Sequence, residues 1–136
     1  MSSELDAARG RLTSSLIDIM AVFEAYSLVR GLIKAAKGLP EASREEKLRE
    51  LSEKLEPVLS SCLADFLEAL FYKGRVSQLA EDISKGFKPP REEVTYLSRE
   101  VLRLCERVEE RVSGAWRVLK PMLREVRGVE AHRHLK

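Results

Sequence analysis

The amino-acid sequence predicts an all-α protein, an up-down-up bundle of three long helices with one additional short helix that caps the bundle. Leu, Glu, Arg, Ala and Lys make up 74 of the 136 residues, a share typical of long helices. Apolar residues also recur every three or four positions along three long segments, which is the periodicity of an amphipathic helix. Residues 1–136 are expected to form a single domain, because the chain is of ordinary domain length.

The first helix is expected from Ser3 to Lys37, because Gly38 and Pro40 follow it. It carries apolar residues on two opposite sides, whereas a surface helix needs only one. One side, expected to face the core, consists of Leu5, Leu12, Leu16, Ile19, Phe23 and Tyr26. The opposite side, rich in small residues that permit close approach of another helix, consists of Ile17, Ala21, Ala25, Leu28, Leu32 and Ala35. We interpret this second side as an oligomer interface, through which dimerisation would complete the bundle.

The second helix is expected to begin at Ser43, which forms a capping-box pattern with Glu46, and to reach Lys73 before Gly74. Pro57 lies inside this segment and should bend it. The apolar stripe widens in the second half, which we therefore expect to be the more deeply buried half, through Leu63, Phe66, Leu67, Leu70 and Phe71.

A short helix is expected from Gln78 to Lys85, ended by Gly86, and we interpret it as the cap over one end of the bundle. The last helix should run from Pro90 to Arg127, with its apolar residues confined to one narrow arc. Residues 128–136 are expected to form a frayed basic tail.

The sequence favours a cytoplasmic protein, because it has no recognisable signal peptide and charged residues interrupt its apolar stretches. Asn is absent and Gln78 is the only Gln, which is typical of a thermophile protein. Buried, inert thiols are the favoured interpretation of Cys62 and Cys105, and a disulfide between them remains open. Their spacing with the two histidines matches no common zinc site, so no metal or cofactor is expected.

The C-terminal segment is strongly basic. Residues 111–136 carry a net charge of +5, whereas the rest of the chain carries −3. The only Trp lies in this segment, and an aromatic ring beside guanidinium groups can stack unpaired bases while the cations hold phosphates. The candidate nucleic-acid-binding residues are Trp116, Arg117, Lys120, Arg124 and Arg127.

A solvated surface or a protein contact is the favoured interpretation of this basic helix, and nucleic-acid binding is the alternative. Arg99, Arg103, Arg107 and Arg111 follow one another every four residues and alternate with glutamates, as on a face with weak exposed ion pairs. Asp65 lies at the border of its apolar stripe, where a carboxylate is usually solvated.

Arg127 and His132 are separated by four residues, and this spacing resembles the Arg-x4-His motif of the HEPN ribonucleases, helical proteins that cleave RNA as dimers. The resemblance implies catalytic roles for these two residues. It covers six residues only, and Gly128 stands where the family has a polar residue.

Three functions follow from these observations. The leading hypothesis is a non-enzymatic helical-bundle binding protein that self-associates or serves as an accessory subunit of a larger complex, because no phosphate-binding loop, nucleophile elbow or zinc-protease motif is present. The alternative is a nucleic-acid-binding helical subunit of a ribonucleoprotein, with single-stranded nucleic acid as its partner. The third is a HEPN-like ribonuclease. Neither a membrane nor a small-molecule substrate is expected as a partner.

Overall fold

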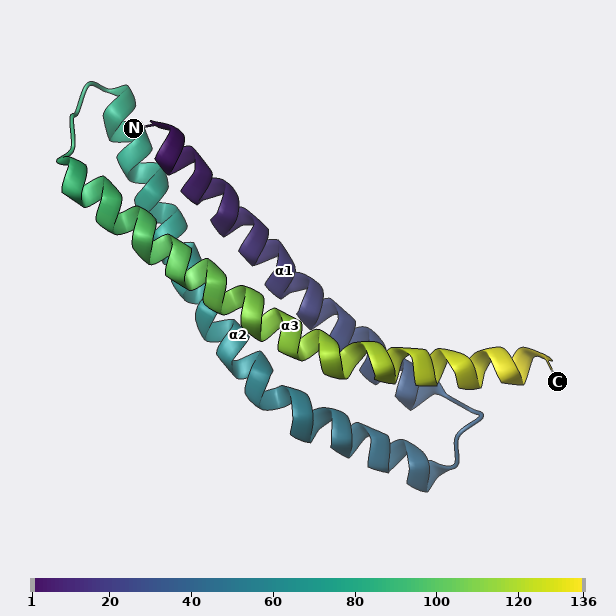
Figure 1. The fold of residues 1–136 in the computed structure, drawn as a ribbon. Helices are drawn as coiled ribbons and strands as arrows, with labels where there is room; N and C mark the ends of the chain where they lie inside the picture. Colours follow the sequence, from purple (N-terminus) through teal and green to yellow (C-terminus); the bar gives the residue numbers. More distant parts are fainter. Residues whose placement is uncertain (1, 136) are drawn as a thin grey trace.

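The protein is a bundle of three long helices in the computed structural model, which describes the backbone of residues 2–135 and the side chains of residues 3–128. The helices are α1 (Ser2–Ala35), α2 (Glu41–Ser84) and α3 (Arg91–Leu135), and the described residues contain no strand. Figure 1 shows α1 and α3 running in the same direction and α2 running in the opposite direction. The predicted all-α, up-down-up arrangement of three long helices is therefore confirmed.

The prediction of a separate short capping helix is wrong, because residues 78–84 are the last turns of α2. Gly74 and Ser77 lie inside the helix and do not interrupt it. Val76 is fully buried and Leu79 is 8% exposed, so the core-facing stripe continues past the glycine. A glycine inside a helix costs only about 1 kcal/mol, which the burial of these two side chains exceeds.

Both ends of α2 are set by the backbone. The helix begins at Glu41 and not at Ser43, with Pro40 as its N-cap and without a side-chain cap. The carbonyl of Pro40 accepts the first helical hydrogen bond from the N–H of Arg44 at 3.0 Å. At the other end, Gly86 adopts φ +100° and the N–H of Phe87 bonds to the carbonyl of Asp82 at 3.0 Å. This is a Schellman ending, and it confirms Gly86 as the stop.

The last helix is longer than predicted. α3 begins at Arg91, continues through Gly128 and ends at Leu135, so Arg127 is not its end. Pro57 and Pro121 both lie inside helices, and Figure 1 shows α2 and α3 curving along their length. A proline removes one backbone hydrogen bond and favours a bend without ending a helix that packing holds in place.

The core consists of two clusters that follow one another along the bundle. The first core cluster includes Leu12 and Ile19, and the second includes Leu55 and Leu119. Three partly buried side chains pack against both clusters and join them, namely Phe23, Val58 and Val112. The first apolar side of α1 faces this core as predicted, although Phe23 and Tyr26 are only half-buried.

None of the helices in the described part of the chain is long and apolar enough to cross a membrane.

Candidate functional site

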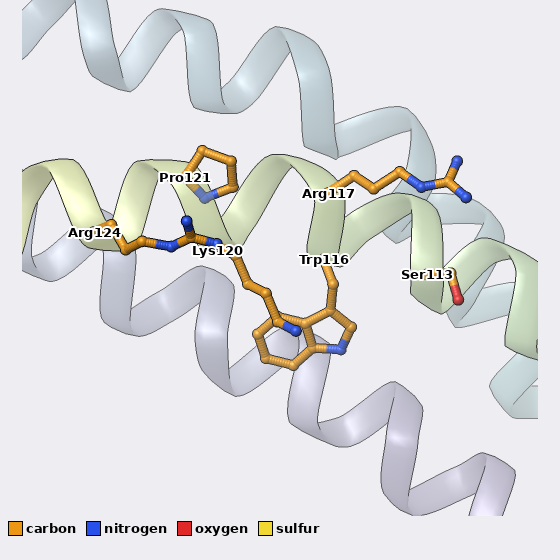
Figure 2. Close-up of a pocket in the computed structure, with 6 residues that line it drawn as sticks. All are labelled: Ser113, Trp116, Arg117, Lys120, Pro121 and Arg124. Carbon is orange, nitrogen blue, oxygen red and sulfur yellow. The ribbon is translucent and has the colours of Figure 1, made fainter.

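Four of the five residues predicted to bind nucleic acid line one open hollow on α3, which we call the α3 hollow (Figure 2). Its volume is about 450 Å³. The lining residues recur three and four positions apart, so the helix places them on one side over about three turns. They are Ser113, Trp116, Arg117, Lys120, Pro121 and Arg124. Arg127 is exposed but does not line the hollow.

Trp116 anchors the α3 hollow. Its side chain is half-buried and packs against the second core cluster, so the ring is held by the bundle. The Nζ atom of Lys120 lies 5.9 Å from the ring centre, a cation–π contact. In Figure 2, Arg124 reaches back toward Lys120 and Pro121, whereas Arg117 points away from the indole. The hollow therefore combines an aromatic ring with cations at its border.

A second surface is apolar and lies along α1 and α2; we call it the apolar face. Its six large side chains are between 45% and 60% exposed, and they are Ile17, Met20, Leu63, Leu67, Leu70 and Phe71. A groove of about 290 Å³ runs into it between the two helices, lined by Met20, Phe23, Glu24, Leu63 and Phe66. Because α1 and α2 are antiparallel, Ile17, which precedes Met20, lies beside the residues that follow Leu63.

The second half of α2 is not the more deeply buried half, contrary to the expectation from the sequence. Leu63, Leu67, Leu70 and Phe71 are exposed, whereas Leu51 and Leu55 in the first half are fully buried. The two neighbouring helices can cover only part of the wide apolar arc of α2. The sequence pattern revealed the width of the arc but not which part of it would be covered.

The predicted oligomer interface on α1 is divided between surface and core. Ile17 and Leu28 are 59% and 49% exposed, and Ala35 is also exposed. Ala21 is half-buried, and Ala25 and Leu32 pack against the second core cluster. Ile17 is the only one of the six predicted residues that belongs to the apolar face.

Charged residues of opposite sign flank the apolar face. Glu24 lines its groove beside Leu63, and the exposed Glu56 lies two turns before Leu63 on the same side of α2. At the other end, the guanidinium of Arg75 lies 6.0 Å from the ring centre of Phe71. The face thus has Glu24 and Glu56 at one end and Arg75 at the other.

Asp65 is the polar residue that the sequence pattern missed, because it is 2% exposed and not solvated. Arg107 donates from Nε at 3.1 Å to its Oδ1, and Arg111 donates to both carboxylate oxygens at 2.7 Å. Arg107 also donates to Glu68 at 2.5 Å. Burial lowers the pKa of Arg107, but the charges of Glu68 and Asp65 and their hydrogen bonds raise the pKa above its usual value.

This cluster ties α2 to α3 and is structural. Asp65 follows Cys62 by three positions and precedes Ala69 by four, so it lies inside a buried stripe. Arg107 and Arg111 are four positions apart and reach it together from α3. The four-residue spacing of these two arginines was the signal in the sequence that could have revealed the cluster. The interleaved glutamates, however, favoured the interpretation of a solvated face.

Both cysteines are buried free thiols. Burial raises the pKa of the Cys62 thiol, the charge of Asp65 raises it further, and Arg111 opposes the shift. The thiol is therefore held protonated at neutral pH, which favours the interpretation of Cys62 as an inert core residue. Within the described side chains, no three His, Cys, Asp or Glu residues gather as potential metal ligands.

The residues of the HEPN-like spacing lie on one continuous helix, because α3 runs through Gly128. Arg127 is exposed, and the side chain of His132 lies outside the described residues.

Comparison of the chain with protein families, with curated proteins and with solved structures gave no match. Its function must therefore be inferred from its own surfaces.

Proposed function

We propose that this chain is a non-enzymatic binding protein that works as a dimer, or as a self-associating subunit of a larger complex, through the apolar face. The observation that carries this proposal is the apolar groove between α1 and α2, which Met20 and Leu63 line, together with the further half-exposed large apolar side chains of these two helices. Isolated exposed leucines are ordinary, but a contiguous patch of this kind is typical of a protein–protein contact.

The size of the face suits a second copy. A half-exposed Leu, Met or Phe side chain presents on the order of 100 Å², so six of them offer roughly 600 Å². A two-fold contact would then bury roughly 1,200 Å² in total, the lower end of specific interfaces before any polar rim is counted.

The charges at the two ends favour a second copy over an unrelated partner. In a two-fold contact the same patch meets itself, so the two ends of the patch must complement each other. Antiparallel packing of α2 against α2 of the partner brings the acidic end with Glu24 toward the basic end with Arg75. The contact is therefore attractive at both ends and repulsive at neither.

Mass measurement by light scattering and by sedimentation tests the proposal. The unaltered chain should have twice the mass of one chain at micromolar concentration. Leu67→Glu should give monomers, because it introduces a charge at the centre of the face. Leu102→Glu is the matched control, since Leu102 is a 39% exposed residue of α3 outside the face and its replacement should leave the dimer intact.

A charge swap separates a second copy from a foreign partner. Glu24→Arg alone and Arg75→Glu alone should each weaken the dimer, whereas the double variant should restore it. Restoration is expected only if the acidic end of one copy faces the basic end of another.

A monomeric mass for the unaltered chain at high micromolar concentration would contradict the proposal, and so would a dimer that survives Leu67→Glu.

The variant Leu28→Glu distinguishes the interface that the sequence predicted on α1 from the apolar face. Leu28 is exposed on the second side of α1 but lies outside the apolar face, so loss of the dimer in this variant alone would move the interface there.

A further inference from the structure

We propose that the α3 hollow is a binding site for single-stranded nucleic acid, in which an unpaired base stacks on Trp116 and the neighbouring cations hold the phosphates. This site lies on α3 and does not depend on the apolar face or on dimerisation.

The ring of Trp116 is pre-positioned. Because its side chain packs against the second core cluster, little conformational freedom is lost when a base stacks on it. Lys120 now contacts the ring at 5.9 Å, an exposed cation–π contact worth about two- to five-fold in an equilibrium constant. Stacking of a base on an aromatic side chain is worth about five-fold to more than 100-fold. Exchange of Lys120 for a base is therefore favourable, and it frees the ammonium for a phosphate.

The cations are spaced to follow a strand. Arg117, Lys120 and Arg124 line the hollow, and the first and last of them are seven positions apart, or about 10 Å along the helix axis. Within the part of the chain whose side chains are described, none of the three lies within ion-pair distance of a carboxylate. Figure 2 shows the guanidinium of Arg117 directed away from the indole on one side, and that of Arg124 reaching back toward Lys120 on the other. A strand running along α3 would meet a cation on each side of the stacked base.

The shape favours an unpaired strand over a duplex or an acidic protein. A base inside a duplex is already stacked and cannot reach the indole, whereas an unpaired base can be accommodated in an open hollow of about 450 Å³. The carboxylates of an acidic peptide would use the cations but would not stack on the aromatic ring.

Fluorescence of Trp116 provides the first test, because it is the only Trp. Titration with a short single-stranded oligo(U), and separately oligo(dT), should quench the emission and saturate. With three phosphates neutralised, the slope of log affinity against log salt is about −2, so raising salt from about 50 mM to about 200 mM should weaken binding about 20-fold.

Variants measured by the anisotropy of a labelled oligonucleotide provide the second test. Lys120→Glu with Arg124→Glu should abolish binding, whereas Arg91→Glu with Arg99→Glu should leave most of it, because both arginines are exposed on the same helix far from the hollow. Trp116→Phe should retain binding and Trp116→Leu should lose about tenfold, since only the former preserves a ring. Circular dichroism of each variant establishes that the bundle is folded.

Several results would overturn the proposal. A flat fluorescence titration at low salt would exclude the site, and binding that survives Lys120→Glu with Arg124→Glu would place it elsewhere. If a duplex of the same length bound as tightly as the single strand, the proposed stacking of a base on Trp116 would be wrong. Polyglutamate binding as tightly as oligo(U) would identify the hollow as a contact for acidic proteins.

Discussion

Arg111 of α3 donates to both carboxylate oxygens of Asp65 of α2, at 2.7 Å to each. The two partners differ in their access to water, because the side chain of Asp65 is 2% exposed and that of Arg111 is 37% exposed. Loss of the arginine would leave a buried negative charge, whereas loss of the carboxylate would leave a cation that water can reach.

Arg111→Ala is therefore expected to be more destabilising than Asp65→Ala. The arginine variant should lower the free energy of unfolding by about 2–3 kcal/mol, at the low end for a broken buried pair because Arg107 still contacts the carboxylate. Asp65→Ala should cost about 1 kcal/mol, since solvent screens the exposed guanidinium. Urea denaturation of both variants measures the difference.

Equal costs, or a larger cost for Asp65→Ala, would contradict this account of the ion pair. The double replacement Asp65→Leu with Arg111→Met should recover most of the lost stability, because two apolar side chains leave no unpaired charge.

Opposite effects are expected when Gly74 and Gly86 are each replaced by alanine. Gly74 lies inside α2 with nothing within 4 Å of an added Cβ, so Gly74→Ala should stabilise the protein by about 1 kcal/mol. Gly86 has φ +100°, so Gly86→Ala should destabilise it by about 1–2 kcal/mol. Thermal unfolding followed by circular dichroism provides both values. A destabilising Gly74→Ala would indicate that α2 is broken at this residue.

The two core clusters are expected to unfold together, because Phe23, Val58 and Val112 pack against both. Leu12→Ala in the first cluster and Leu119→Ala in the second should each lower the free energy of unfolding by about 3 kcal/mol. Each variant should still unfold in a single transition, with its midpoint at a lower denaturant concentration. A second transition in either variant would show that the halves of the bundle are independent.

The thiol of Cys62 should react slowly in the folded protein. Its raised pKa leaves less thiolate at a given pH than a free cysteine has, and burial denies access to the reagent. Alkylation of the folded Cys105→Ala variant should accelerate as pH rises toward that pKa, and it should become fast on unfolding at constant pH. Rapid alkylation of the folded protein at neutral pH would contradict the burial of this thiol.

The sequence was sufficient to predict the helices and much of the α3 hollow. Helical periodicity is a local property, so the three long helices and the shared face of Trp116, Lys120 and Arg124 could be read from spacing alone. The stop at Gly86 was also predictable, but the break at Gly74 was not real, because burial of Val76 and Leu79 outweighs the local preference of a glycine.

Tertiary contacts decided the remaining features. The burial of Asp65 depends on two arginines more than 40 residues away, which no local pattern reveals. Likewise, the exposure of Leu67 and Phe71 depends on where α1 and α3 lie around α2. The sequence therefore predicted that apolar surface would be left over, but it placed that surface on α1 alone.

The length of α3 affects how the protein will behave in solution. A straight helix of 45 residues spans about 68 Å, whereas a spherical chain of this size would be only about 37 Å across. An elongated particle experiences more friction than a sphere of equal mass and elutes early from a sizing column. A single copy calibrated against spherical standards would therefore appear too heavy, so elution volume alone would mistake a monomer for a dimer.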